Sequence, residues 1–110
     1  MEDISNILSH VEESILRFVA AKYIYLFGSH AYGQPHEDSD IDIYLVVPDD
    51  AGNLTELYTE IICDLSLKDI FFIDLKLNRE SNFNFRKDRF TLEETIINKG
   101  RLLYEDRRSS

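Results

Sequence analysis

The fold depends on two stretches of the sequence, GSHAYG at residues 28–33 and SDIDI at residues 39–43. An apolar run at residues 23–27 leads into the first stretch, and another at residues 41–47 begins within the second. Both runs are short, rich in β-branched or aromatic residues and bounded by Gly, Pro, Asp or Ser, so they predict strands. Strand side chains alternate, which places Asp40 and Asp42 on one face, roughly 7 Å apart. Two carboxylates beside a glycine-rich turn predict a site for a hard cation and a phosphate.

The composition predicts one globular domain. The chain has 110 residues, of which 44% are hydrophobic and 30% charged, as in an ordinary globular protein. We expect the domain to span residues 1–105 and residues 106–110 to form a frayed tail. The formal net charge of −9 disfavours nonspecific binding to nucleic acid, which needs clustered Lys and Arg, so no direct nucleic-acid contact is expected. The same charge is compatible with a basic protein partner.

Cysteine content and the N-terminal residues bear on the compartment. The single cysteine, Cys63, cannot form an internal disulfide, which favours a reducing compartment. The first residues, MEDIS, lack the basic and apolar regions of a signal peptide, and no apolar run is long enough to span a membrane. We therefore expect a cytoplasmic protein without a membrane partner.

Periodicity and turn residues predict alternating helices and strands. Amphipathic spacing predicts helices at residues 3–21, from Asn53 through Leu65, and at residues 88–98 before Gly100. Strands are predicted at residues 23–27, 41–47 and 70–77, and residues 102–104 either add a short edge strand or pack on the core. The segments at residues 28–39 and 78–86 are polar and are predicted to be irregular.

The predicted fold class is α/β (α+β), a small mixed β-sheet flanked by helices. The strands at residues 41–47 and 70–77 are joined through a helix and should be parallel. The strands at residues 23–27 and 41–47 are joined by a loop of about a dozen residues and could pair antiparallel.

Asp74 interrupts the apolar run at residues 70–77, where a buried unpaired carboxylate would cost several kcal/mol. If the strands at 41–47 and 70–77 are neighbours, Asp74 stands roughly 5 Å from the row of Asp40 and Asp42. Three like charges this close repel one another, and a divalent cation would remove that penalty. The alternative is that Asp74 pairs with Lys76 or an arginine while the other two carboxylates are solvated. Together with the preceding Gly-Ser, the three aspartates favour the metal site.

Three features are spaced in a recognisable way: Gly28-Ser29, then ten residues, then Asp40-Ile41-Asp42, and then a lone aspartate in a later strand. This pattern resembles the nucleotidyltransferase superfamily that includes DNA polymerase beta. The resemblance extends over residues 23–104, and the closing stretch at residues 96–104 is also similar. The chain is most similar to the minimal nucleotidyltransferase domains of bacteria and archaea, which implies a polymerase-beta-like fold.

The resemblance implies a reaction and a set of site residues. A nucleoside monophosphate, AMP if the nucleotide is ATP, would pass to an acceptor hydroxyl with release of pyrophosphate. Asp40 and Asp42 would hold two Mg²⁺ ions, with Mn²⁺ as a possible substitute, and Asp74 would complete the second metal site and accept the hydroxyl proton. Gly28 and Ser29 would bind the triphosphate oxygens. Such a reaction asks the protein mainly to position groups and to neutralise charge.

The resemblance also implies a partner. Small members of this kind often act as antitoxins that attach AMP to a tyrosine of a helical ribonuclease-type toxin. The alternative is a binding module that neutralises its partner by contact alone, favoured by Tyr32, which stands where these loops often carry a basic residue. An antibiotic-modifying transferase is disfavoured because those enzymes carry a second domain. A basic cluster could grip the triphosphate or a partner, or form a solvated loop; it comprises Arg79, Arg86, Lys87 and Arg89.

Overall fold

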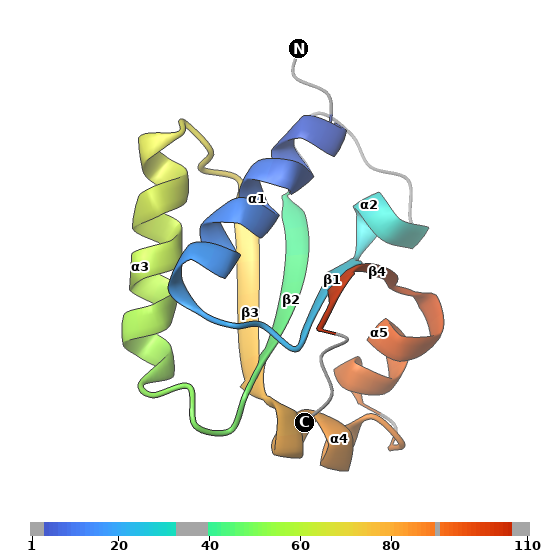
Figure 1. Cartoon of the computed structure of the whole chain (residues 1–110). Helices are drawn as coiled ribbons and strands as arrows, with labels where there is room; N and C mark the ends of the chain where they lie inside the picture. The colour runs from blue at the N-terminus through green and yellow to red at the C-terminus, as the bar shows by residue number, and fades with distance from the viewer. Residues whose placement is uncertain (1–3, 33–39, 90, 107–110) are drawn as a thin grey trace.

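The computed structural model describes residues 4–32, 40–89 and 91–106, except for the side chains of Ser29 and Tyr32. Its centre is a four-stranded sheet in the order β3-β2-β1-β4 (Figure 1). The strands are β1 (Tyr23–Phe27), β2 (Ile41–Val47), β3 (Ile73–Arg79) and β4 (Arg101–Glu105). β1 is antiparallel to β2 and to β4, and β2 is parallel to β3. The predicted mixed sheet and both predicted strand directions are confirmed.

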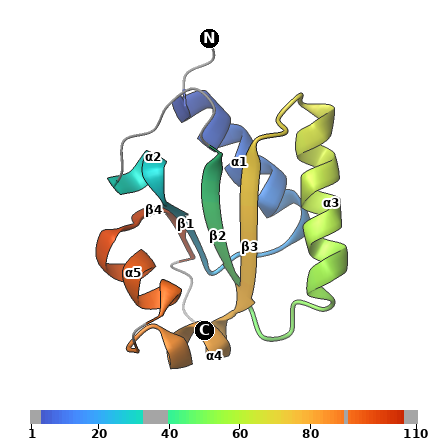
Figure 2. The same cartoon turned by 180° about the vertical axis from the view of Figure 1, so that it is seen from behind.

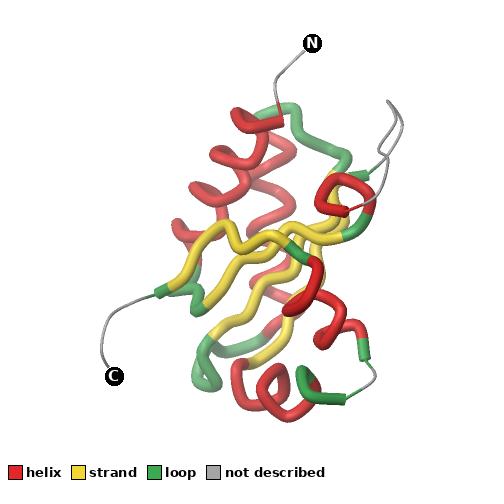
Figure 3. The backbone as a smooth tube through the Cα atoms, turned by 90° about the vertical axis from the view of Figure 1, so that its right-hand side faces the viewer, coloured by secondary structure: helices red, strands yellow, loops and turns green. Residues whose placement is uncertain are grey.

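Helices cover both faces of this sheet. On one face lie α1 (Ile4–Phe18) and α3 (Leu54–Leu67), and at the other lie α4 (Glu80–Arg86) and α5 (Leu92–Lys99) (Figure 3). The short helix α2 (Ser29–Tyr32) follows β1 almost directly. Figure 2 shows that α2, the start of β2 and the loop between α3 and β3 all lie at one end of the sheet. The predicted site residues belong to this end.

β2 is buried from both sides because its side chains alternate between two apolar clusters. Its odd-numbered residues join the cluster that α1 and α3 cover. Tyr44 and Val46 pack instead with Phe83 of α4 and Ile96 of α5. Because Phe83 and Ile96 are 1% and 0% exposed, they fix α4 and α5 against the face of β2 that also carries Asp42.

Asp64 is a buried carboxylate that joins α1 to α3. It accepts hydrogen bonds from the Ser14 hydroxyl at 2.7 Å and from the Arg17 guanidinium at 3.0 Å, and the Lys68 ammonium lies at 3.5 Å. The hydrogen bond from Ser14, aided by the charges of Arg17 and Lys68, lowers the pKa of Asp64 despite burial. These partners give the buried charge a structural explanation, because a buried carboxylate needs hydrogen-bond and charge partners.

Two predictions of irregular structure are wrong. Within residues 78–86, β3 continues to Arg79 and α4 follows. A seven-residue helix is shorter than the window over which an amphipathic pattern becomes visible, and the buried face of α4 is Phe83 alone. The predicted loop at residues 28–39 begins with α2, and its residues 33–39 lie outside the described part of the chain.

Other boundaries shift by a few residues. β3 begins at Ile73 instead of residue 70, although Ile70 is still buried in the cluster of α1 and α3. α5 begins at Leu92, where the Thr91 hydroxyl accepts a hydrogen bond from the backbone N–H of Glu94 at 3.2 Å and so caps the helix. Residues 102–104 belong to β4, an edge strand beside β1.

The C-terminal tail is described only at its beginning. The backbone N–H of Asp106 donates to the carbonyl of Lys22 at 2.9 Å, and residues 107–110 lie outside the described part. No helix in the described ranges is both long and apolar enough to cross a membrane.

Candidate active site

Asp42 lies at the centre of a row of three residues that crosses the sheet. It pairs with Phe27 of β1 in the antiparallel register and with Asp74 of β3 in the parallel register. Paired residues point to the same face of a sheet, so Asp42 and Asp74 stand side by side. The face is the one that α4 and α5 cover, because Tyr44, two residues after Asp42, packs there.

The carboxyl groups of Asp42 and Asp74 interact directly. Burial is the largest cause that raises the pKa of Asp42 above its ordinary value, followed by a hydrogen bond with Asp74 and by the charges of Asp74 and Asp40. The charge of Lys76 opposes this shift, and its Nζ lies 3.8 Å from Oδ1 of Asp74. Crowding of like charge beside a partly buried carboxyl favours a bound cation.

Asp40 lies just before β2 and is exposed. Its charge reaches Asp42, but nowhere in residues 4–32, 40–89 or 91–106 are three Asp, Glu, His or Cys side chains arranged to hold a metal ion. The structure brings Asp42 and Asp74 together, and the role of Asp40 as a third metal ligand stays a prediction. Oxygen donors and crowded negative charge nevertheless fit a hard divalent cation such as Mg²⁺.

Gly28 brings the backbone of the turn after β1 against the carboxylate of Asp42. Its φ is +72°, and a Cβ atom built on it would lie 2.1 Å from Oδ2 of Asp42. Only glycine fits there, because a side chain would be strained by the positive φ and would overlap the carboxylate. The carbonyl of Gly28 accepts a hydrogen bond from the N–H of Ala31 at 3.0 Å, which starts α2. The Ser29 side chain lies outside the described part of the chain.

One family model matches almost the whole chain. The family is described as Polymerase beta, Nucleotidyltransferase, and the match covers residues 2–109. The chain belongs to the polymerase beta nucleotidyltransferase family. The resemblance seen in the sequence is thereby confirmed, together with the polymerase-beta-like fold and the assignment as a nucleotidyltransferase.

Known proteins are similar to this nucleotidyltransferase in sequence and in fold. It is 33% identical over 102 residues to the protein named "Putative protein adenylyltransferase MJ0604" of Methanocaldococcus jannaschii, covering 84% of this chain and 97% of that protein. A crystal structure of a toxin-antitoxin with AMP-PNP is similar at 21% identity and a TM-score of 0.56, covering 90% of this chain and 73% of the other. A crystal structure of a mutant of the toxin-antitoxin MntA-HpeT is similar at 23% identity and a TM-score of 0.51, covering 97% of this chain and 76% of the other. At these identities the two solved structures establish a shared fold.

A polar network lies on the same face of the sheet as Asp42 and Asp74. The Tyr44 hydroxyl donates to Glu93 of α5 at 2.8 Å and accepts from the Asn78 amide at 3.2 Å, and Arg86 Nε donates to Glu93 at 2.9 Å. Burial alone would raise the pKa of Glu93, but the hydrogen bonds from Tyr44 and Arg86 lower it; burial raises the pKa of Tyr44. The sequence gives one signal for this network, the position of Tyr44 two residues after Asp42, but it does not reveal the partners.

Three arginines of the predicted basic cluster contact other parts of the fold. Arg79 donates to the carbonyls of Asp49 and Gly52 at 3.0 and 2.6 Å. Arg86 holds Glu93, and the guanidinium carbon of Arg89 lies 3.9 Å from the centroid of the Phe85 ring. These contacts lie within the chain, so the three arginines help to hold the fold together, and a grip on the triphosphate or a partner stays a prediction.

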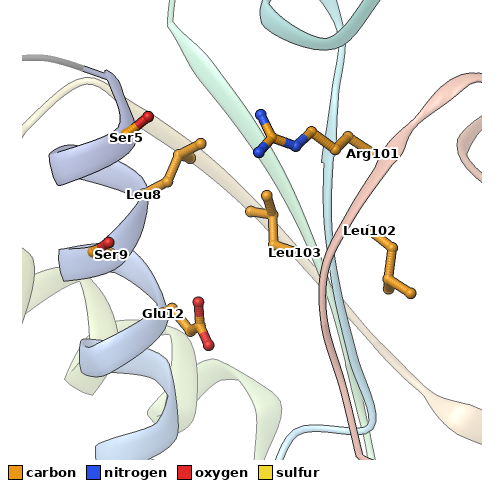
Figure 4. Close-up of a pocket in the computed structure, with 7 residues that line it drawn as sticks. All are labelled: Ser5, Leu8, Ser9, Glu12, Arg101, Leu102 and Leu103. Carbon is orange, nitrogen blue, oxygen red and sulfur yellow. The ribbon is translucent and has the colours of Figure 1, made fainter.

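A cavity of about 250 Å³ lies between α1 and β4 (Figure 4). Its lining includes Leu8 and Glu12 of α1 and Arg101 and Leu103 of β4. It lies on the sheet face that α1 covers, whereas Asp42 and Asp74 lie on the face of α4 and α5. The cavity is therefore separate from the acid pair.

Proposed function

We propose that this nucleotidyltransferase transfers AMP from ATP to a hydroxyl group on a partner protein, as the antitoxin of a toxin–antitoxin pair. The observation that carries the proposal is the turn at Gly28, packed against the carboxylate of Asp42, which is itself paired with Asp74. In this arrangement a backbone turn that would bind phosphate lies beside an acid pair that would bind a cation. The relative named for protein adenylyl transfer and the fold shared with toxin–antitoxin structures support the choice of substrates.

The metal requirement follows from the acid pair. Asp42 and Asp74, together with Asp40, would hold two Mg²⁺ ions, which when bound neutralise the triphosphate and activate the acceptor hydroxyl. The pairing of Asp42 with Asp74 supports this assignment, because two carboxylates side by side repel each other and a cation would relieve that repulsion.

The reaction is an in-line displacement at the α-phosphorus. The acceptor oxygen forms a bond to phosphorus, the bond from phosphorus to the bridging oxygen breaks, and pyrophosphate leaves with that electron pair. Asp74 takes the hydroxyl proton; its side chain is 45% exposed, so an incoming hydroxyl can reach it. Gly28, and Ser29 beside it, would bind the phosphate oxygens through the backbone and the Ser29 hydroxyl.

The acceptor should arrive on another protein. A pocket for a small acceptor is usually concave and lined by convergent polar groups, and the cavity beside α1 is on the other face of the sheet from the acid pair. A basic partner would also complement the formal net charge of −9. A helical ribonuclease-type toxin is the partner that we propose.

Transfer of label from ATP tests this function. The purified protein is incubated with Mg²⁺, ATP labelled at the α-phosphate and a protein that co-purifies with it. We expect the partner to gain the mass of AMP, and Asp74→Asn to lose at least about a hundredfold in rate while it still binds the partner. Asp50→Asn, an exposed aspartate beyond the end of β2, is the matched control and should keep full activity.

The competing binding-module function predicts a different result. If wild type and Asp40→Asn neutralise the partner equally well and the mass of the partner never changes, transfer is not the mechanism. Contact alone would then account for the antitoxin role.

A further inference from the structure

Two aromatic side chains are exposed at the end of the sheet that carries the site. Phe71 and Phe72 lie in the loop between α3 and β3 and are 71% and 40% exposed. This loop reaches the same end of the sheet as α2 and the start of β2 (Figure 1). Two adjacent exposed aromatic residues give this end of the sheet an apolar surface next to the acidic residues, and aromatic residues are enriched at interaction surfaces.

The backbone ties this aromatic pair to the acidic residues. The N–H of Ile41 donates to the carbonyl of Phe72 at 2.9 Å, which extends the β2–β3 ladder beyond the strand. Since Ile41 pairs with Ile73, the register places Phe72 beside Asp40. Asp74 follows two residues later on the same segment, so Phe72 is held beside the acid pair, and Phe71 precedes it in the exposed loop.

The order of the strands indicates which substrate, the triphosphate or the acceptor, approaches the acid pair from the side of Phe72. Gly28 ends β1, on one side of β2, whereas β3 is the outer strand on the other side of β2. A triphosphate at Gly28 therefore occupies the β1 side of Asp42. The acceptor hydroxyl must reach the α-phosphorus from the opposite side of the acid pair, which is the side of β3 and of Asp74.

We propose that Phe71 and Phe72 form the docking surface for the polypeptide segment that carries the acceptor hydroxyl; this inference rests on the proposed function. The surface selects an apolar residue next to the acceptor residue, because the two rings offer a large apolar area. Asp69, which is not among the proposed metal ligands, lies two residues before Phe71, and the chain has a formal net charge of −9, so the segment carries Lys or Arg beside the apolar residue.

Two synthetic peptides test the docking surface. Each carries one tyrosine between lysines; one has leucine next to the tyrosine, and the other has glycine there. The protein is assayed with MgATP for transfer of AMP to each peptide and for hydrolysis of ATP to AMP and pyrophosphate, in which water is the acceptor. We expect wild type to prefer the leucine peptide. Phe71→Ser and Phe72→Ser should each lower kcat/KM for that peptide about tenfold, mainly through KM, and abolish the preference.

The controls separate docking from other roles. Hydrolysis should stay within about twofold in both variants, because water needs no docking surface, and their melting temperatures should stay near that of wild type because the rings are exposed. Phe85→Ser is the matched control, since Phe85 is 61% exposed on α4, and it should change neither reaction.

Several results would overturn the docking surface. An equal loss of hydrolysis and transfer in the variants would assign the rings to nucleotide binding or to the fold. Unchanged transfer in the variants would exclude docking. Docking would also be excluded if the wild type hydrolyses ATP but transfers AMP to neither peptide. A dimer of the wild type that Phe71→Ser converts to a monomer would assign the surface to a second copy of the chain. If neither hydrolysis nor transfer occurs, the proposed function itself fails.

Discussion

Replacement of Gly28 by alanine tests whether the turn after β1 really packs against the acid pair. The new Cβ would lie 2.1 Å from Oδ2 of Asp42, where ordinary contact begins at 3.4 Å. The carboxylate, the turn, or both must therefore move by a total of about 1.3 Å, the difference between these two distances. A displacement of about 1 Å at a reacting centre can cost about a hundredfold in rate.

The same substitution also strains the backbone. A non-glycine residue at the φ of +72° costs roughly 1–2 kcal/mol, and the overlap with Asp42 adds to this cost. We expect Gly28→Ala to destabilise the protein by about 2–3 kcal/mol in urea unfolding and to lower the rate of ATP hydrolysis or AMP transfer about a hundredfold.

Gly52→Ala separates strain from overlap. Gly52 also has a positive φ, +86°, but a Cβ there would meet no atom within 4 Å. This variant should lose about 1 kcal/mol of stability and keep its activity. If both variants lose the same stability and Gly28→Ala remains fully active, the close approach of the turn to Asp42 does not exist in solution and the proposed phosphate site is wrong.

Three further predictions concern the metal, the pH dependence and the polar network. Mg²⁺ or Mn²⁺ should raise the melting temperature, because a ligand that binds only the folded state stabilises it, and a shift that survives in both Asp42→Asn and Asp74→Asn would contradict the placement of the ions. Because the pKa of Asp42 is raised above its unfolded value of 3.8, the metal-free folded state holds this proton more tightly than the unfolded state does. The proton on Asp42 therefore contributes its full stabilisation of the folded state below pH 3.8, and this stabilisation is lost as the pH rises through the pKa of Asp42 in the folded state. Urea unfolding measured at a series of pH values across this range should show a smaller loss of stability with rising pH for Asp42→Asn than for wild type. Tyr44→Phe should cost about 1–2 kcal/mol in urea unfolding, because it removes one hydrogen bond to the buried Glu93, and an unchanged midpoint would show that Arg86 alone satisfies Glu93.

The sequence predicts most of the sheet because its strands are local patterns. β1 and β2 have the predicted bounds, since each is a short apolar run between turn residues. The common face of Asp42 and Asp74 follows from alternation and from the crossover through α3, which makes β2 and β3 parallel neighbours.

Other features depend on contacts between residues far apart in the sequence. α4 is stabilised by the burial of Phe83 among Tyr25 and Tyr44, which no local pattern reveals. Glu93 reaches Tyr44 across 49 residues, so its role could not be foreseen from its position.

The parallel pairing of β2 with β3 has a consequence for the order of folding. Gly28 and Asp42 meet through the pairing of β1 with β2, which are close in the sequence, whereas Asp74 joins them only after α3 has crossed the sheet and β3 has docked. Parallel pairing through such a crossover closes a long loop and is a late, slow event. A cation or nucleotide that requires Asp74 cannot assist the earlier steps. We therefore expect ligands to act mainly by slowing unfolding, with little effect on the rate at which the chain folds.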